Sequence, residues 1–454
     1  MEQADNAGLR SDAAAIWQAG LAAVRPGSLI HEALSIGNSD LLDTLKAADR
    51  ILVVGAGKAG AAMAAAVETE LASLLDRVEG VVNVPAEAVR PLRKIVLHAA
   101  RPAGTNQPTA EGVAGTRRIL ELVPRAGRND VALCLISGGG SALLPAPVDD
   151  VTLQDKQRVT GLLHACGATI NEMNVVRKHL SKVKGGRLAQ AFTGRSLVSL
   201  IISDVVSDPL DVIASGPTAP DPTTFADALG ILEKYDLSDK VPQAVRQHLE
   251  KGATGRIPET PKSLPENVRN VVIGNNAGAL AAAAARAREL GYSVVNLGSN
   301  IEGETSPVAK RLAGVARSIA QDAQPAAAPA CILSGGETTV TLHAGHGIGG
   351  RNQEFVLAAA LELGERSLRD IVILSGGTDG EDGPTDAAGA IADSATLHAA
   401  ARLGLDPQAF LTRHDAYHFF SGTQDLLRTG LTDTNVMDVR VILVGKPASN
   451  SSPR

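Results

Sequence analysis

Three apolar runs in this chain each end at the same tripeptide, Ser-Gly-Gly. The runs are residues 131–136, 330–333 and 371–374, and the serines that follow them are Ser137, Ser334 and Ser375. Short, branched apolar runs that end at glycine are typical of buried parallel strands in an α/β sheet. Ligands bind at the carboxyl ends of such strands, where glycine lets backbone N–H groups approach an anion closely. Three such loops predict a site for a polyanion, and a nucleoside triphosphate is the obvious candidate.

The composition narrows the class of protein. A chain of 454 residues is expected to form two or three domains. Hydrophobic residues make up 44% of the chain but aromatic residues only 2%, so the cores must be aliphatic. The formal net charge of -6 and the scarcity of aromatic side chains argue against a nucleic-acid-binding protein.

Cysteine usage and the distribution of apolar residues indicate a cellular location. The three cysteines, Cys134, Cys166 and Cys331, show neither a disulfide pattern nor the spacing of metal ligands, as is usual in a reducing cytoplasm. No apolar stretch reaches the length of a membrane span, and residues 1–12 are polar and acidic. We therefore expect a cytoplasmic protein without a membrane partner.

Alternating strand-like and helix-like segments indicate the domain organisation. They follow one another from residue 51 to residue 203, which is typical of right-handed βαβ units and a largely parallel sheet. The segment 252–266 holds three prolines among polar residues and is the best candidate for a linker. The expected α/β domains are therefore residues 1–251 and 267–454, the second opening with an apolar strand near residue 271.

The sequence GAGKAG, from Gly55 to Gly60, fits the pattern G-x-G-x-x-G between a strand and a helix. A dinucleotide site also needs an acidic residue at the end of the next strand, where this chain has Asn83. Lys58 lies inside the loop, where its charge opposes the helix dipole, so a negatively charged ligand would account for it better than folding does. A phosphate site that includes Gly55 and Gly57, a plain tight turn and a dinucleotide site all remain open.

A second cationic candidate follows two glycines. Arg351 stands directly after Gly349-Gly350 and before a helical run. Its planar guanidinium can bind a phosphate or carboxylate through two hydrogen bonds. A solvated turn with a surface arginine is the alternative.

Acidic residues gather after two of the predicted strands. Asp379, Asp382 and Asp386 lie in one glycine-rich loop, where mutual repulsion is costly without a cation. Such oxygen ligands suit Mg²⁺, which one or two carboxylates hold together with phosphate oxygens. Asp204 and Asp208 follow the strand near residue 200, and either one could bind metal or accept a proton. An acidic surface loop and helix capping are the alternatives.

Residues 177–187 form a strongly basic segment in an acidic chain. Lys178 and Lys182 are four residues apart and are expected to share a helical face, where they repel each other. A solvated charged face is the ordinary explanation, and a patch that attracts an anionic substrate is the rival.

Seven motifs together resemble those of the MOFRL-type glycerate 2-kinases, some of which carry the older label hydroxypyruvate reductase. In order along the chain they are VVGAGKAGAAMA, LISGGGSALL, NVVRKHLSKVKGGRLA, ISDVVSDPLDVIASGPT, SGGETTV, GGRNQEFVLAAAL and GTDGEDGPTDAAGAIAD. The resemblance runs from Ile51 to Asp438 and covers nearly the whole chain.

The resemblance implies a Rossmann-like N-terminal domain with a mainly parallel sheet, a smaller C-terminal MOFRL-type α/β domain, and an active site between them. It implies ATP-dependent phosphorylation of D-glycerate at its 2-hydroxyl, with Mg²⁺ or another divalent cation. Lys58 and Arg351 match its functional lysine and arginine, and Asp204 is our candidate general base. The expected phosphate-binding residues are Gly55, Gly57, Ser137, Gly138, Gly139, Gly140, Ser141, Ser334, Gly335, Gly336, Gly376 and Gly377. The expected metal ligands are Asp379, Asp382, Asp386 and Asp208.

The chain departs from the family pattern in two places. The loop from His98 to Asn106 lacks the acid that ends it in many members, so no catalytic role is assigned there. The stretch after Gly303-Glu304 lacks the usual Ala-Arg pair, which removes a possible arginine contact.

Two other functions stay open. An NAD(P)H-dependent hydroxypyruvate reductase is disfavoured by Lys58, by the missing acid after the glycine loop and by the lack of a clear His/acid pair. A non-catalytic regulator that binds a phosphosugar or nucleotide is disfavoured by the acidic loop, since mere binding has less need of a metal site.

Overall fold

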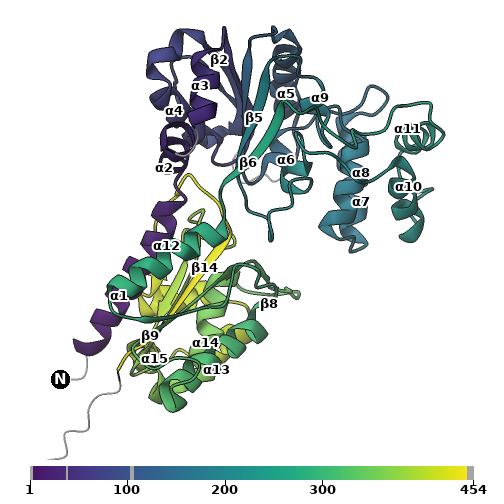
Figure 1. Ribbon diagram of the computed structural model, residues 1–454. Coiled ribbons are helices and arrows are strands. Elements are labelled where there is room, and N and C mark those ends of the chain that lie inside the picture. The colour runs from purple at the N-terminus through teal and green to yellow at the C-terminus, as the bar shows by residue number, and fades with distance from the viewer. Residues whose placement is uncertain (1–3, 37–38, 103–106, 447–454) are drawn as a thin grey trace, which may run out of the picture. The chain divides into compact units, whose positions relative to one another are not determined.

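The computed structural model describes residues 4–36, 39–102 and 107–446, and the chain in it forms two compact units. One unit combines Met1–Arg25 with Gly274–Arg454, and we call it the C-terminal unit. The other is Pro26–Ile273, and we call it the N-terminal unit. The chain therefore passes from one unit to the other twice (Figure 1).

A six-stranded sheet in the order β3-β2-β1-β4-β5-β6 forms the centre of the N-terminal unit. The pairs β1–β2, β1–β4, β2–β3 and β4–β5 are parallel, as expected. This strand order is that of a Rossmann fold, and its switch point lies between β1 and β4. The strands are β1 (Ile51–Ala56), β2 (Val78–Pro85), β3 (Ile95–Arg101), β4 (Val131–Ile136), β5 (Ser196–Ile202) and β6 (Val268–Gly274).

Helices connect and cover these strands. Three of them begin with a capping box, in which a threonine and the acid three residues later satisfy the first N–H groups; the threonines are Thr152, Thr169 and Thr224. The helix after the first glycine loop, α4, ends at Glu70 and is followed by a 3-10 helix over Ala72–Arg77. The helical elements of this unit are α2 (Pro26–His31), η1 (Glu32–Ile36), α3 (Ser39–Lys46), α4 (Gly60–Glu70), η2 (Ala72–Arg77), η3 (Ala86–Ala88), α5 (Ala110–Leu122), η4 (Val123–Arg125), α6 (Gly140–Leu143), α7 (Leu153–Ala165), α8 (Ile170–His179), α9 (Arg187–Gln190), η5 (Ile213–Ser215), α10 (Phe225–Lys234) and α11 (Gln243–Ala253).

The helices α7, α8, α10 and α11 form a group with its own apolar core beside the sheet (Figure 1). The segment 252–266, expected as a linker, packs against this unit. The Asp221 N–H donates to Pro261 O at 2.9 Å, and Thr260 donates to the Asp221 carboxylate at 3.0 Å. The units therefore divide after Arg25 and after Ile273, not within 252–266. The prolines and polar residues of that segment therefore belong to a loop packed on the N-terminal unit, and not to a linker between the units.

The sheet of the C-terminal unit is mixed, in the order β13-β12-β11-β14-β9-β7. β14 lies between β9 and β11 and is antiparallel to both, while β7 and β9 are parallel. The expectation of a parallel strand is therefore wrong for β11, which is antiparallel to β12 and β14, and it holds for β9 only on the side of β7. A strand buried on both faces is a continuous apolar run whichever way its neighbours point. The strands are β7 (Ser293–Asn296), β8 (Gly303–Glu304), β9 (Ala330–Gly336), β10 (Thr338–Thr339), β11 (Ile371–Gly377), β12 (Gly389–Ala392), β13 (Leu426–Leu427) and β14 (Asp438–Val444).

Helices cover both faces of this sheet, with α1 and α12 on one face and α13 and α14 on the other (Figure 1). Trp17 of α1 is fully buried, and its Nε1 donates to Gly376 O at 3.4 Å. The helices are α1 (Ala4–Ala23), α12 (Asn276–Glu289), α13 (Thr305–Asp322), α14 (Arg351–Ser367), α15 (Ser394–Leu403), α16 (Pro407–Thr412) and α17 (Ala416–Thr423). Across the described residues of both units, none of the helices has the length and apolar character needed to cross a membrane.

Candidate functional site

The two glycine loops of the N-terminal unit are hydrogen-bonded to each other at the switch point. The Lys58 N–H donates to Gly138 O at 2.8 Å, and the Ala59 N–H donates to Ser137 Oγ at 3.0 Å. Gly57 has a φ of 155°, and a Cβ there would lie 2.0 Å from Ser137 Oγ. Only glycine allows this approach. Lys58 is therefore presented from a loop whose position the second loop fixes.

Ser137, expected to bind phosphate, does not present its hydroxyl to a ligand. Its side chain is buried, and its Oγ serves the first turn of α4 as an acceptor. Gly139, with a φ of 75°, lies at the N-cap of α6, so Gly140 and Ser141 belong to that short helix. Half-buried Ser141 is thus the hydroxyl of this loop nearer to solvent.

The basic segment 177–187 is not a solvated face. Lys178 is 2% exposed and its Nζ donates to Asp211 at 2.9 Å and to Asp221 at 3.2 Å. Helix α8 ends before Lys182, which is exposed and pairs with Asp149, so Lys178 and Lys182 do not share a helical face.

Lys184, also 2% exposed, connects two loops. Its Nζ lies 2.9 Å from Ser141 O, 3.2 Å from Ser141 Oγ and 3.3 Å from Ala214 O. Burial, with the nearby charges of Lys156 and Arg177, lowers the pKa of Lys184 well below its usual value. The Oγ atoms of Ser141 and Ser215 are 2.6 Å apart.

Asp204 lies two residues beyond the end of β5, at the edge of the sheet where β1 and β4 also end. Ser203 Oγ accepts the N–H of Val205 at 3.3 Å and so shapes the turn. Asp208 has a φ of 54°, a left-handed conformation that is uncommon outside glycine. The adjacent strand ends place Asp204 on the same side of the sheet as the two glycine loops.

In the C-terminal unit, Asp438 lies in register between Gly336 of β9 and Gly377 of β11. Arg351, the first residue of α14, donates to its carboxylate from Nε at 2.8 Å and from Nη2 at 3.0 Å. Arg351 thus makes its two-bond contact with an internal carboxylate, and its contact with a ligand anion stays a prediction. Nη1 of Arg351 lies 2.8 Å from Glu337.

Charge balance around Arg351 is set by these acids. Burial acts to lower the pKa of Arg351, but Asp438 and Glu337 outweigh it and the pKa is raised. Burial raises the pKa of Glu337, which Arg351 lowers only in part. Arg440, 1% exposed, also donates to Asp438, at 3.1 Å. Burial lowers the pKa of Arg440, and the charge of Asp438 opposes this effect.

A pocket of about 380 Å³ opens beside Arg351 within the C-terminal unit. Its polar lining includes Glu337, Glu354 and His414, and Nδ1 of His414 lies 2.7 Å from Glu354. Its apolar lining includes Leu342. This volume suits a small organic molecule.

The three aspartates of the glycine-rich loop have different partners. Asp382 is buried and accepts the Asn352 N–H at 3.0 Å and the Gln353 N–H at 2.8 Å, so it caps α14. Burial raises the pKa of Asp382 to about 7, against the lowering effect of these N–H groups. Asp386 accepts from Tyr417 and Arg428.

These acids do not form the expected metal site. Both oxygens of Asp382 are engaged at a helix terminus, and Asp386 lies in an exposed ion pair. Asp379 is the third of these aspartates, and its Oδ1 accepts the Glu381 N–H at 3.2 Å. Within the part of the chain that the structure describes, no group of three or more His, Cys, Asp or Glu side chains could hold a metal ion.

Expected phosphate-binding residues of the C-terminal unit lie mostly inside it. Ser334 is 1% exposed, and a Cβ on Gly335 would lie 1.7 Å from Asn276 Oδ1. A Cβ on Gly376 would lie 3.0 Å from the Trp17 ring. These glycines therefore allow close packing of α12 and α1 on the sheet. Gly336 and Gly377 flank Asp438, at the strand ends near Arg351.

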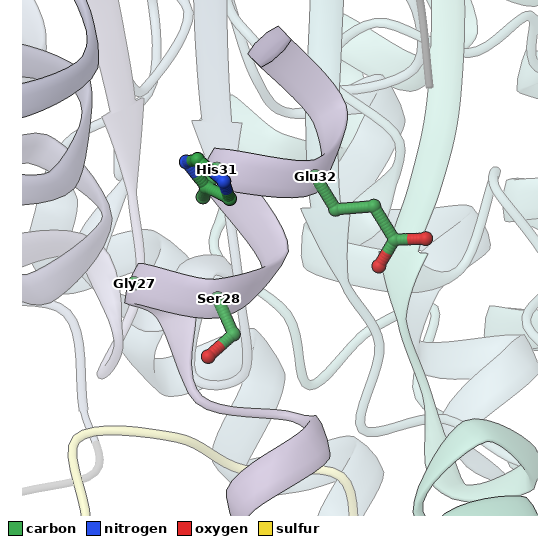
Figure 2. A pocket seen from close by; sticks show the side chains of 4 residues that line it. All are labelled: Gly27, Ser28, His31 and Glu32. Carbon is green, nitrogen blue, oxygen red and sulfur yellow. The ribbon is translucent and has the colours of Figure 1, made fainter. Parts of the chain in front are cut away.

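Another hollow lies over α2 and the start of η1 (Figure 2). It measures about 500 Å³ and is lined by Gly27, Ser28, His31 and Glu32. Nδ1 of His31 pairs with Glu70 at 3.1 Å. One stretch of helix supplies the whole lining, without the convergent polar groups of a binding site.

Sequence reasoning missed Lys184, Ser215, Glu337 and Asp438 as site residues. The available signals were a lysine between apolar and glycine residues (VKGG) and an Asp–Arg pair opening an apolar strand (DVRV). Charged residues in such settings are buried only when they are paired. Residues 103–106, part of the loop that departs from the family, lie outside the described residues.

The strand order and the two joined glycine loops define a Rossmann-like α/β protein with an appended mixed α/β unit. The MOFRL family matches residues 330–438, and a domain of unknown function, DUF4147, matches residues 12–250. The chain belongs to the MOFRL-type glycerate 2-kinase family, which confirms the resemblance.

Similar proteins span nearly the whole chain. A glycerate 2-kinase of Pyrococcus horikoshii is 40% identical over 87% of each chain. The D-glycerate 2-kinase of Thermotoga maritima is 39% identical over 87% of this chain and 91% of its own. A protein of Agrobacterium vitis, provisionally named hydroxypyruvate reductase, is 44% identical over 87% of each chain. Both labels that the sequence analysis raised thus occur among the relatives.

Solved structures show the same architecture. The glycerate kinase of Thermotoga maritima has a TM-score of 0.85 at 36% identity, covering 96% of this chain and 99% of its own. A protein of Pyrococcus horikoshii has a TM-score of 0.82 at 36% identity, covering 97% of this chain and 99% of its own. The expected two-domain α/β fold is confirmed.

Proposed function

We propose that the chain catalyses ATP-dependent phosphorylation of D-glycerate at its 2-hydroxyl, giving 2-phosphoglycerate and ADP. One observation carries the proposal: a lysine in a glycine loop, hydrogen-bonded to a second glycine loop at the switch point. Most of the relatives described above, matched over 87% of this chain, are named glycerate 2-kinases.

Lys58 and the loop of residues 137–141 are our candidates to bind the phosphates of ATP. Phosphoryl transfer needs the reacting groups held in line and the charge on the transferred group neutralised. A cation on a fixed loop supplies this without reorganising during the reaction. Lys58 satisfies the requirement because Gly138 O and Ser137 Oγ fix the backbone on either side of it.

Arg351 is our candidate to bind a substrate anion, the carboxylate of glycerate or a phosphoryl oxygen. Its Nε and Nη2 remain on Asp438, so the contact falls to Nη1, which now meets Glu337 at 2.8 Å. Asp438 then orients the guanidinium. The pocket of about 380 Å³ beside it provides the space.

Asp204 is our candidate to accept the proton of the 2-hydroxyl. A general base must reach the proton that it removes. Asp204 follows a strand that ends beside β4, on the side of the sheet from which Lys58 is presented.

We further propose that Mg²⁺ acts with ATP and that Asp379 is its principal protein ligand. Mg²⁺ commonly takes one or two carboxylates together with substrate phosphates, so a single acid suffices. Asp208 is the alternative ligand. When bound, the ion neutralises charge on the phosphate oxygens.

The reductase name of one relative makes hydride transfer the second candidate. A dinucleotide site would use an acid at the end of β2, but Asn83 stands there and is fully buried. Its Nδ2 donates to Leu143 O at 2.8 Å and to Thr116 at 3.2 Å. Asn83 therefore serves packing and is not available to a ribose, which favours the kinase.

Purified protein with D-glycerate, ATP and Mg²⁺, followed by ³¹P NMR, tests the proposal. We expect a monoester signal identical to that of added 2-phosphoglycerate. NADH with hydroxypyruvate is run in parallel. Oxidation of NADH without phosphate transfer would identify the protein as the reductase instead of the kinase. A lack of activity in both assays would favour a binding protein.

A further inference from the structure

We infer that Lys184 is a positioning residue for the proposed phosphoryl transfer: it holds the loop of residues 137–141 against the turn of residues 214–216. The inference rests on the proposed function, because it assigns that loop to ATP. Lys184 is 2% exposed and so acts through the groups it touches. These are the carbonyl and hydroxyl of Ser141 and the carbonyl of Ala214, all within 3.3 Å of Nζ.

The turn that Lys184 contacts has an unfavourable backbone. Ala214 has a φ of 51° and Ser215 a φ of 62°, a left-handed backbone conformation that residues other than glycine rarely adopt. Two such residues in sequence persist only where the surroundings hold them. Ser215 Oγ donates to Asn174 Oδ1 at 3.0 Å, and Ser215 O accepts the Gly185 N–H at 3.0 Å.

The turn of residues 214–216 also limits where the glycine loop of residues 137–141 can lie. A Cβ on Gly140 would lie 2.9 Å from the Ala214 Cβ and 3.1 Å from Ala56 O, so α6 starts in close contact with both. Two residues earlier, Gly138 O accepts the Lys58 N–H. A continuous path of contacts thus joins Lys184, through Ser141 and α6, to the backbone of Lys58.

Lys156 shows that burial of a lysine does not require this arrangement. It is 6% exposed, and its Nζ donates to Leu180 O at 3.0 Å. Among the described residues, no hydrogen bond joins the Lys156 side chain to either loop, and its charge acts on Lys184 only from a distance. Lys156 is therefore a matched control for the loss of a buried lysine.

The experiment compares Lys184→Met with Lys156→Met in the full-length protein. Steady-state kinetics gives kcat/KM for ATP and KM for glycerate, and hydrogen exchange with mass spectrometry follows residues 137–144. Misplacement of a reacting group by about 1 Å costs roughly a hundredfold in rate. We expect Lys184→Met to lose about that factor in kcat/KM for ATP, with KM for glycerate within about twofold and faster exchange in residues 137–144. Lys156→Met should change all three far less, because it removes a like charge near Lys184 but none of the hydrogen bonds that Lys184 makes.

Several outcomes would overturn the inference. Equal kinetics in the two variants would remove any special role of Lys184. Lost activity with unchanged exchange would mean that Lys184 acts on the ligand directly. If Lys184→Met does not fold, Ser215→Ala replaces it. We then expect the same changes to a smaller extent, and unchanged exchange in this variant would overturn the inference. If the wild type does not phosphorylate glycerate, the proposed function fails, and the exchange comparison still decides whether Lys184 holds the loop.

Discussion

Arg351 holds Asp438 through two hydrogen bonds, from Nε at 2.8 Å and from Nη2 at 3.0 Å, at the point where β14 begins between β9 and β11. The ion pair joins the start of α14 to the middle of the sheet. It also leaves Nη1 as the edge of the guanidinium that meets the half-exposed Glu337. The arginine is therefore both a support of the unit and a candidate for binding a substrate anion.

Arg351→Lys should lose most of its activity although the charge is kept, because an ammonium cannot make the two-bond contact with Asp438. We also expect a loss of about 3 kcal/mol in the free energy of unfolding, since Asp438 is fully buried. Urea unfolding and kinase assays measure the two effects. A double-mutant cycle with Asp438→Asn should show strong coupling, and additive effects would show that the pair is not a unit.

Lys58→Ala should abolish turnover and leave the fold intact. Removal of a cation that stabilises the transition state costs roughly a thousandfold in rate. The loop conformation depends on backbone contacts to Gly138 and Ser137, which the substitution leaves in place. Activity assays and circular dichroism test this, and near-normal kinase activity in a folded variant would reject Lys58 as a catalytic residue.

Asp379→Asn should raise the Mg²⁺ concentration needed for turnover more than it changes KM for glycerate, because a neutral amide is a poorer ligand for Mg²⁺. EDTA should silence the wild type and added Mg²⁺ should restore it. Asp386→Asn, at an exposed ion pair with Arg428, is the matched control and should titrate like the wild type.

Asp382→Asn separates metal binding from structure in the same loop. It should lower the free energy of unfolding by about 1–2 kcal/mol, because it weakens the cap of α14. Mg²⁺ titrations of the three variants decide the assignment. If the curve for Asp379→Asn overlays that of the wild type, Asp208 becomes the next residue to test.

Lys156→Met should stabilise the protein more at pH 6.5 than at pH 9.5. Burial lowers the pKa of Lys156 from 10.5 to about 7, so the unfolded chain binds more protons at this site between those values. The contribution of the lysine to the free energy of unfolding therefore rises with pH across this window and is lowest below pH 7. The advantage of methionine should be a few kcal/mol at the lower pH, measured by urea unfolding. An advantage that does not change with pH would contradict the lowered pKa.

The fold of the N-terminal unit could be predicted from the sequence because its signals are local. Each glycine loop follows an apolar strand, and the connection rules for parallel strands then restrict the topology. Lys58 stood out because a cation inside a glycine loop has no reason to be there for folding.

The features that could not be predicted depend on partners distant in sequence. Asp438 and Arg351 are 87 residues apart, and the Ser141–Ser215 contact joins residues 74 apart. An acidic loop suggested metal binding because the sequence does not show that Asp382 faces the first N–H groups of α14. Likewise, the apolar run of β14 does not indicate whether its neighbouring strands are parallel or antiparallel to it.

The place of α1 has a consequence for how the chain is made. Trp17 belongs to the core beside Gly376, while β14, whose strand fills the centre of the same sheet, is not complete until Val444. During synthesis the first helix therefore precedes all of its partners by a long stretch of chain, since α12 begins only at Asn276 and β14 follows later still, after the entire N-terminal unit. A C-terminal fragment without residues 4–23 would leave the part of this sheet face beside α12 uncovered, so it should aggregate when expressed alone and recover when a peptide of that segment is supplied.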